Sequence, residues 1–121
     1  MHIVSLRQKS DFLRLKESKK KFFVSSAVIV VANTPEIPGN DLSDSIRVGF
    51  IVTKKIGGAV QRNRARRRLK AAFRKACSFY SVVGLDIIFI ARNGALSVKF
   101  ADMVENIAQL LQKLKLEHEN N

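Results

Sequence analysis

The sequence predicts an α+β sandwich, in which helices pack on a small sheet. Apolar and polar residues alternate over residues 46–52, and the stretches 22–32 and 85–92 are rich in β-branched residues, which is typical of strands. Over residues 65–76 and 100–114, apolar residues recur every three to four positions instead, as in helices that bury one face. With a short helix near the start, the predicted order is α-β-β-α-β-α.

Three main strands are expected. The first covers residues 22–32 and the second covers 46–52, and we expect these two to form an antiparallel hairpin. The loop between them holds Pro35, Pro38, Gly39 and Asn40, which are typical of a solvated turn region. The third strand, residues 85–92, follows a helix and therefore joins the sheet by a crossover connection.

Three helices are expected between and after the strands. Ser10 is a candidate N-cap for the first helix, and Ser97 is a candidate N-cap for the last. The second helix, in the C-terminal part of the basic segment that starts at Lys54, carries one apolar stripe that should pack on the sheet. That stripe consists of Ala65, Leu69, Ala72, Phe73 and Ala76. We expect one domain over residues 1–121, with a core from about 7 to 116 and mobile termini.

Charge is distributed very unevenly along the chain. The formal net charge is +12, from 22 Lys and Arg and 10 Asp and Glu. No acidic residue occurs from 46 to 84, although eleven Lys and Arg do. Like charges one turn apart destabilise a helix, and a bound polyanion relieves that repulsion. The pattern therefore predicts a nucleic-acid partner.

The basic residues of the second helix should form two flanks around the apolar stripe. Arg67, Lys70 and Arg74 line one flank, and Arg64, Arg68 and Lys75 line the other. Arg62 and Arg66 fall near the edge of the stripe and should point along the sheet. The preceding Gly57 and Gly58 fit either a phosphate contact or a tight turn into the helix, and both interpretations stay open.

The residues expected of a protein active site are missing from the sequence. His2 and His118 lie at opposite ends of the chain, and no Cys/His cluster suits zinc. Two-metal phosphodiester chemistry requires clustered carboxylates, whereas Asp86 is the one acid in a predicted core strand. We therefore expect a binding protein with no catalytic residue and no metal site of its own.

Cysteine content and hydropathy indicate the compartment. The single Cys77 cannot form an internal disulfide, and we expect it to be a small core residue. The N-terminal residues lack an apolar signal core, and the longest apolar run is far shorter than a membrane-spanning helix requires. We expect a cytoplasmic protein without a membrane partner.

Short blocks along the chain resemble the bacterial ribonuclease P protein component. The segment VTKKIGGAVQRNRARRRLKAAFR is similar to that family's signature, with its Arg-Asn-Arg core at Arg62, Asn63 and Arg64. DFLRLK near the start, RVGF in the second strand and DIIFIAR in the third match in order and spacing. Other nucleic-acid-binding domains fit less well. The RNA-recognition fold requires a different order of elements, the KH domain requires a Gly-x-x-Gly motif, and helix-turn-helix proteins lack three strands of this kind.

The resemblance implies a subunit that does not itself cut RNA. It would bind a large catalytic RNA and the 5′ leader of precursor tRNA, and promote endonucleolytic removal of that leader. The magnesium would be held mainly by the RNA, and DNA is not an expected partner. The alternative is a basic ribosomal or RNA-chaperone protein without a catalytic RNA, which explains the charge but not the ordered blocks.

The resemblance also implies two sets of site residues. The expected contacts to the catalytic RNA are Lys54, Lys55, Arg62, Asn63, Arg64, Arg66, Arg67 and Lys70. The expected lining of a leader cleft is Phe12, Lys16, Val28, Val30, Ile51, Arg62 and Arg66. Lys16 stands where some members have an aromatic residue, so leader binding here should rely more on charge than on stacking. Gly58 stands where many members have Asn, which leaves one side chain fewer for RNA or metal contact.

Overall fold

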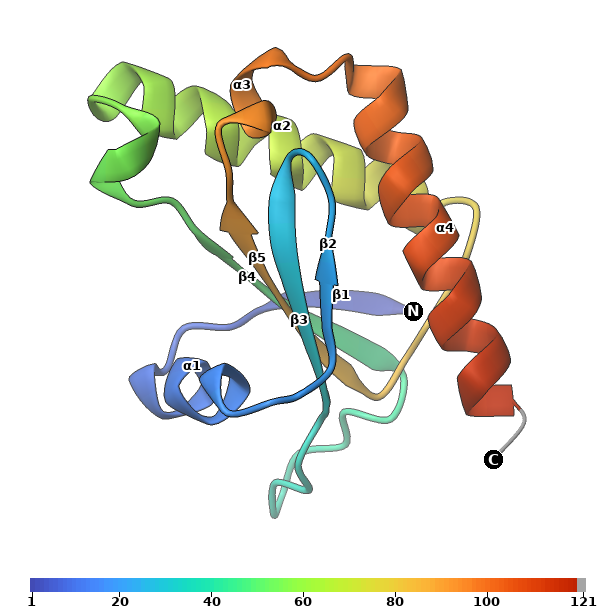
Figure 1. Cartoon of the computed structure of the whole chain (residues 1–121). Helices are drawn as coiled ribbons and strands as arrows, with labels where there is room; N and C mark the ends of the chain where they lie inside the picture. The colour runs from blue at the N-terminus through green and yellow to red at the C-terminus, as the bar shows by residue number, and fades with distance from the viewer. Residues whose placement is uncertain (120–121) are drawn as a thin grey trace.

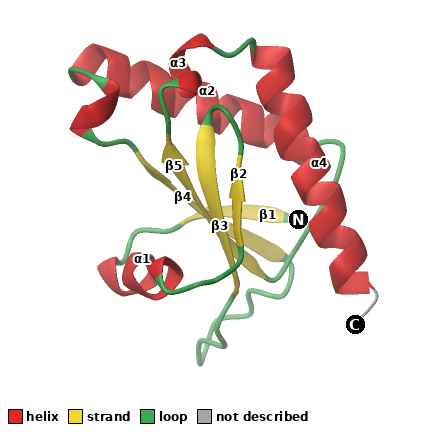
Figure 2. Ribbon diagram, viewed as in Figure 1, coloured by secondary structure: helices red, strands yellow, loops and turns green. Residues whose placement is uncertain are grey.

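The α+β class is confirmed by the computed structural model, which describes residues 1–119. A mixed five-stranded sheet is covered by helices on both faces (Figure 1), and loops connect the layers (Figure 2). The elements in chain order are β1 (His2–Ser5), α1 (Lys9–Lys16), β2 (Lys21–Phe23), β3 (Ala27–Asn33), β4 (Ser45–Ile51), the 3-10 helix η1 (Lys54–Ile56), α2 (Ala59–Cys77), β5 (Leu85–Ala91), α3 (Gly94–Ser97) and α4 (Phe100–Glu119). The last residues were expected to be mobile, and two of them, residues 120 and 121, lie outside the described part of the chain.

The strands are arranged in the order β1-β4-β5-β3-β2. β5 pairs parallel with β4 and antiparallel with β3, while β2 and β3 form an antiparallel hairpin. The sequence LDIIFIA of β5 is apolar on both faces apart from Asp86, and most of the strand is buried. A strand that is buried on both faces belongs in the middle of a sheet, and β5 occupies that place.

Two strand predictions are corrected by this topology. Residues 22–32 form two strands instead of one, because the chain reverses at Val24, whose amide donates to the carbonyl of Ala27. The expected hairpin between 22–32 and 46–52 is also wrong. β3 and β4 do run in opposite directions, but β5 lies between them and pairs with both.

The N-terminal strand was not expected from the sequence. β1 pairs parallel with β4, from His2 opposite Ser45 to Ser5 opposite Val48. Its four residues are too few to show an alternating pattern, and parallel pairing to a distant strand leaves no local turn signal. The terminal amino group also lies 3.5 Å from a carboxylate oxygen of Asp44.

The main core lies between the sheet and the helices α2 and α4. All five residues of the predicted α2 stripe are buried, which confirms that prediction. Phe73 of α2 packs edge-on against Phe89 of β5, with ring centroids 5.4 Å apart. Cys77 is buried as expected, and burial raises the pKa of its thiol to about 11. Within residues 1–119, no helix combines the length and apolarity needed to cross a membrane.

Neither predicted serine cap is found. α1 begins at Lys9 after Gln8, so Ser10 lies inside the first turn. Ser97 is the last residue of the short α3, and α4 begins only at Phe100. Where a helix begins depends on the turn that precedes it, and the sequence pattern did not show those turns.

The opposite face of the sheet carries a smaller apolar cluster beneath α1. Leu6 and Leu15 pack there with Val30 of β3 and Ile88 of β5. Since α1 is only eight residues long, it covers part of this face and leaves the rest open.

Candidate nucleic-acid interface

The polar faces of α2 carry the highest density of cations in the chain. Eight of its 19 residues are Lys or Arg, and none is acidic. Asn63, Arg67, Lys70 and Arg74 are exposed on one side of the apolar stripe, and we call these four residues the basic flank. A shallow hollow on this side is lined by Val60, Asn63, Arg66, Arg67 and Lys70. The cationic surface thus has an apolar patch at the start of the helix.

The charges of this segment are uncompensated. Among the side chains of residues 1–118, no cation between 54 and 75 lies within ion-pair distance of a carboxylate. Lys70 approaches the half-buried ring of Phe50, with its ammonium nitrogen 5.8 Å from the ring centroid. A surface with this charge attracts phosphates strongly, because no carboxylate of the described residues neutralises it.

Arg68 has a different role from the other cations of α2. Its guanidinium donates a hydrogen bond of 2.8 Å to the carbonyl of Ala95 and a second hydrogen bond to that of Val98. Both carbonyls belong to the segment that contains α3 and leads into α4. Arg68 therefore fixes α3 to α2, and the flank predicted from Arg64, Arg68 and Lys75 has only two free members in the described chain.

The glycines before α2 make the turn into the helix. Gly57 has a φ of 141°, which favours glycine, and Gly58 is the N-cap residue. Gly58 offers no capping side chain, and the first turn contains no acidic residue. The first amides of α2 therefore point out of the helix next to the exposed Lys54 and Lys55 of η1. The tight-turn interpretation is thus supported, and phosphate contact stays a prediction.

Arg62 and Arg66 lie at the edge of the buried apolar stripe of α2. Both side chains are half-buried. The Nε of Arg62 is buried without a hydrogen-bond partner in the described residues, and Arg66 reaches Asn63 only at 3.4 Å. Two guanidinium groups with N–H donors that are unpaired in the described chain thus lie in the N-terminal part of α2, at the end of the helix that follows β4 and η1 along the chain.

The open part of the other sheet face is a row of apolar side chains. Strand register places Ile51 of β4 opposite Ile90 of β5, and Ile90 opposite Val28 of β3. All three are half-buried, and we call them the apolar row. A hollow at the end of β5 joins Ile90 to the basic residues Lys54, Lys55 and Arg92.

The first helix lies beside the apolar row and presents Phe12 to it. Phe12 and Lys16 are one turn apart on the same flank of α1. Phe12 is half-buried with its ring over Gly49, where an added Cβ would lie 2.8 Å from the ring. Gly49 and Ile51 share a face of β4, so the ring lies at the β4 end of the row.

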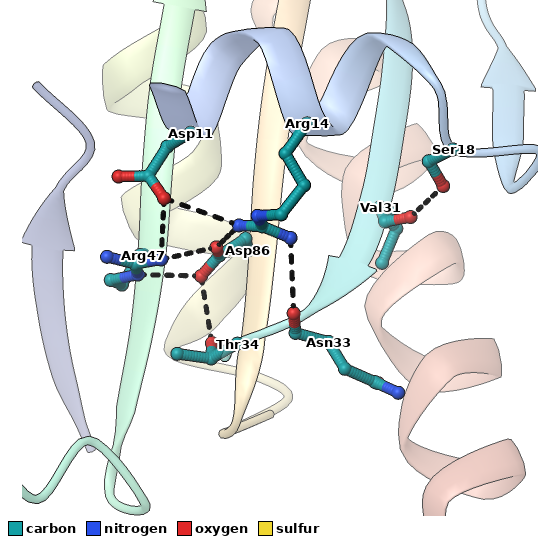
Figure 3. A network of polar contacts seen from close by, with 8 residues as sticks. All are labelled: Asp11, Arg14, Ser18, Val31, Asn33, Thr34, Arg47 and Asp86. Carbon is teal, nitrogen blue, oxygen red and sulfur yellow. Dashed lines mark hydrogen bonds and ion pairs between the residues drawn. The ribbon is translucent and has the colours of Figure 1, made fainter. Parts of the chain in front are cut away.

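A buried charge cluster holds the opposite flank of α1 on the sheet (Figure 3). Asp86 is fully buried and accepts two hydrogen bonds from Arg47, of 2.8 Å and 2.6 Å. Arg14 of α1 also donates to Asp86, and Thr34 donates at 2.8 Å. Asp11 of α1 accepts a 3.2 Å hydrogen bond from Arg47. The hydrogen bond to Asp86 is the largest cause that raises the pKa of Arg47, and the negative charges of Asp86 and Asp11 raise it further.

The structure separates the expected site residues into two surfaces. Lys54, Lys55, Asn63, Arg67 and Lys70 are exposed on the η1 and α2 side, and Arg64 is exposed on the other flank of α2. Phe12, Lys16, Val28 and Ile51 are accessible on the α1 side. Val30, however, is only 3% exposed, because Leu15 and α1 cover it, so it supports this surface from below.

Two residues that shape the α1 side were missed by sequence reasoning. Gly49 makes room for the Phe12 ring, and Asp86 anchors α1 through Arg14 and Arg47. Asp86 lies near the start of β5, accepts hydrogen bonds from Arg14, Thr34 and Arg47, and is the centre of the cluster. The one available signal was an acid and an arginine on two otherwise apolar strands.

The described residues do not fit a protein-held metal site. Among the side chains that the structure describes (residues 1–118), no three His, Cys, Asp or Glu come close enough together to ligate an ion. Magnesium prefers several oxygen ligands, and the interface offers mainly cations. No step involving magnesium is therefore assigned to this chain's residues.

These features define a class: a small α+β domain with an uncompensated cationic helix beside an open apolar sheet surface. The sequence model of the family described as Ribonuclease P matches residues 3–115. The chain therefore belongs to the ribonuclease P protein family. Ribonuclease P is a ribonuclease of tRNA processing, and membership in this family implies an RNA partner within a ribonucleoprotein.

Individual relatives agree with the family assignment. The chain is 34% identical over 110 residues to the "Ribonuclease P protein component" of Paramagnetospirillum magneticum, with 90% of this chain and 80% of the relative covered. It is 37% identical over 116 residues to that of Dehalococcoides mccartyi, with 95% and 88% covered. The alternative of a ribosomal or RNA-chaperone protein is not favoured by these matches.

Solved structures agree as well. The RNase P protein from Thermotoga maritima superimposes with a TM-score of 0.71 at 26% identity, covering 90% of this chain and 96% of that one. The Staphylococcus aureus RNase P protein superimposes with a TM-score of 0.68 at 26% identity, covering 92% and 94%.

Proposed function

We propose that this chain binds the catalytic RNA of ribonuclease P through η1 and α2, and the 5′ leader of precursor tRNA along the apolar row. The observation that carries the proposal is the uncompensated charge: in the described residues, no cation from 54 to 75 has a carboxylate partner. RNA phosphates supply the missing negative charge.

The apolar row suits single-stranded RNA. Unpaired bases stack on aromatic rings and apolar side chains, while flanking cations contact the phosphates. Phe12 lies at one end of the row, Lys16 lies one turn further along α1, and Lys54 and Lys55 adjoin Ile90. Paired RNA would not bring its bases to such a surface, whereas an unpaired leader does.

On this proposal the protein contributes binding and orientation. The chain's own residues hold the RNA phosphates and the leader bases, and the magnesium that supports hydrolysis is held mainly by the RNA. The experiment is cleavage of precursor tRNA by the purified protein with and without the catalytic RNA. Cleavage by the protein alone would contradict the proposal.

The leader contact is tested with Phe12→Ala in the reconstituted holoenzyme. The ring is half-buried, so we expect a modest loss of stability and a loss of about 1–3 kcal/mol in binding precursor tRNA. Mature tRNA has no leader and should bind as it does to the unmutated holoenzyme. Leu13→Ala is the matched control, because Leu13 is 51% exposed on the same helix and points away from the sheet.

Equal losses for precursor and mature tRNA would remove Phe12 from the leader contact. Melting curves of both variants distinguish this result from unfolding. Binding of the catalytic RNA alone should be unchanged in both, because α1 lies on the opposite face of the sheet from α2 (Figure 1).

A further inference from the structure

The strand register extends the apolar row beyond the residues considered so far. Phe23 of the edge strand β2 lies opposite Val28 of β3, on the same face as Ile90 and Ile51. The four side chains come from four neighbouring strands and span about 14 Å, at the usual strand spacing. Phe23 is 70% exposed, so its ring contributes little to the core and is available to a partner.

The surroundings of Phe23 are cationic. Lys21 is exposed two residues before it on the same face of β2, Lys19 is exposed in the turn that precedes β2, and neither has a carboxylate partner in the described residues. Arg92 donates a 3.1 Å hydrogen bond to the carbonyl of Val24, which holds its guanidinium at the same turn. Arg92 and Phe23 also line one hollow together. An exposed aromatic ring among cations suits a nucleotide, because the base can stack on the ring while the phosphate pairs with a Lys or Arg side chain.

A second copy of this chain is a poorer occupant for the edge of β2. It would bring a net charge of +12 against an equally positive surface. β2 is also only three residues long and begins with Lys21, and short edges that carry lysine disfavour strand pairing between molecules. Charge complementarity thus favours RNA over a copy of the protein.

We propose that Phe23 is a second aromatic contact for the single-stranded leader, at the β2 end of the row. This rests on the proposed function, in which the leader follows the row. Phe12 lies at the β4 end, next to the strand that leads into η1 and the basic helix. Phe23 therefore contacts leader nucleotides further from the cleavage site than those that Phe12 contacts.

Leader length provides the test. Affinity of the reconstituted holoenzyme is measured for mature tRNA and for precursors with progressively longer leaders. Phe12→Ala should lower affinity from the shortest leaders onward. Phe23→Ala should have no effect on mature tRNA or short leaders, and should lower affinity about fivefold or more once the leader reaches β2.

Three further variants show what kind of contact is lost. Phe23→Tyr should keep the affinity for long leaders, because the ring still stacks, and Phe23→Leu should lose most of it. Phe79→Ala is the matched control: Phe79 is 62% exposed after the end of α2 and should leave every affinity unchanged. Melting curves should be similar for all variants, because both rings are largely exposed.

The outcomes separate the two proposals. An effect of Phe12→Ala without any effect of Phe23→Ala would overturn the second contact and leave the leader proposal intact. No effect of either variant at any leader length would overturn both. A loss shared by mature tRNA, or a loss of self-association of the free protein, would assign Phe23 to another partner and also overturn the inference.

Discussion

At the scale of single residues, the position of Phe12 depends on the absence of a side chain at Gly49. An added Cβ would lie 2.8 and 2.9 Å from two ring atoms of Phe12. Those atoms are at the far end of a side chain on a short helix, so the ring can move away from the sheet. We therefore expect Gly49→Ala to displace the ring at a cost in stability of about 1–3 kcal/mol.

The displacement should be visible in function. Gly49→Ala is expected to weaken binding of precursor tRNA to the holoenzyme as Phe12→Ala does, and to leave mature tRNA unaffected. The double variant should lose no more than Phe12→Ala alone, because the glycine acts only through the ring. Additive losses would show that Gly49 influences the leader by another route.

The buried carboxylate of Asp86 makes Arg47 the more critical of its two arginine partners. Arg47 donates two hydrogen bonds to Asp86 and is itself buried, whereas the side chain of Arg14 is 34% exposed. Removing one partner of a buried pair leaves an uncompensated charge and costs about 3–5 kcal/mol. We therefore expect Arg47→Met to lower the free energy of unfolding, measured by urea denaturation, by this amount.

Arg14→Met is the matched control for this cluster. Water can replace a partly exposed donor, so the expected loss in the free energy of unfolding is about 1 kcal/mol. Equal losses for the two variants would show that Asp86 shares its charge evenly between them. Arg14→Met should also loosen α1 and with it the Phe12 contact, which the precursor affinity reports.

At the scale of elements, α2 combines two functions on different sides of one helix. The basic flank is free for RNA, while Arg68 is bonded to the carbonyls of Ala95 and Val98. Replacing Arg67, Lys70 or Arg74 with Ala should therefore weaken binding of the catalytic RNA without unfolding the protein. Each should also reduce the slope of log K against log salt by about one unit.

Arg68→Ala is the control, since it removes the same charge from the same helix. It should destabilise the protein by about 1–3 kcal/mol, because two partly buried carbonyls lose their donor. Its salt slope should stay near that of the unmutated protein. A slope reduced as much as for Arg67→Ala would mean that Arg68 contacts phosphate as well.

The elements differ in how far the sequence predicted them. The apolar stripe of α2 predicted that helix well, because the pattern repeats over several turns. β5 was also predicted closely, since its apolar run is bounded by Gly84 and Arg92. Local patterns of this kind do not depend on the rest of the fold.

Other elements depend on contacts between distant residues and were mispredicted. The apolar run of β5 suits the middle of the sheet, but it does not show that β3 and β4 are the two strands between which β5 inserts. β1 exists only because β4 offers it a free edge. Within the site, Val30 was expected to line the leader cleft, but Leu15 covers it, and that coverage depends on how α1 packs.

At the scale of the whole molecule, the two faces of the sheet have different surfaces, and on the proposed function each would bind a different RNA. The side of α2 and α4 holds the larger core and displays the basic flank. The α1 side has the smaller cluster, the buried charges and the apolar row. The hollow that contains Lys54, Lys55 and Ile90 connects the two at one end of the sheet. A leader on one face can thus adjoin a catalytic RNA held on the other.

We expect this arrangement to make the stability of the free protein depend on anions. A net charge of +12 without compensation along α2 opposes folding by self-repulsion, most strongly at low salt. Sulfate or pyrophosphate that binds the folded basic surface should stabilise it by mass action. At a hundredfold excess over Kd, the gain is about 2.7 kcal/mol, which corresponds to a rise in Tm on the order of 10 °C.

Chloride at equal ionic strength separates binding from simple screening. Screening weakens repulsion whatever the anion, so chloride should raise Tm less than pyrophosphate does if specific contacts exist. A variant carrying both Arg67→Ala and Lys70→Ala should start from a higher Tm in low salt, because repulsion is reduced, and should gain less from pyrophosphate. If pyrophosphate and chloride act alike on both proteins, the basic flank only repels itself and does not hold anions in place.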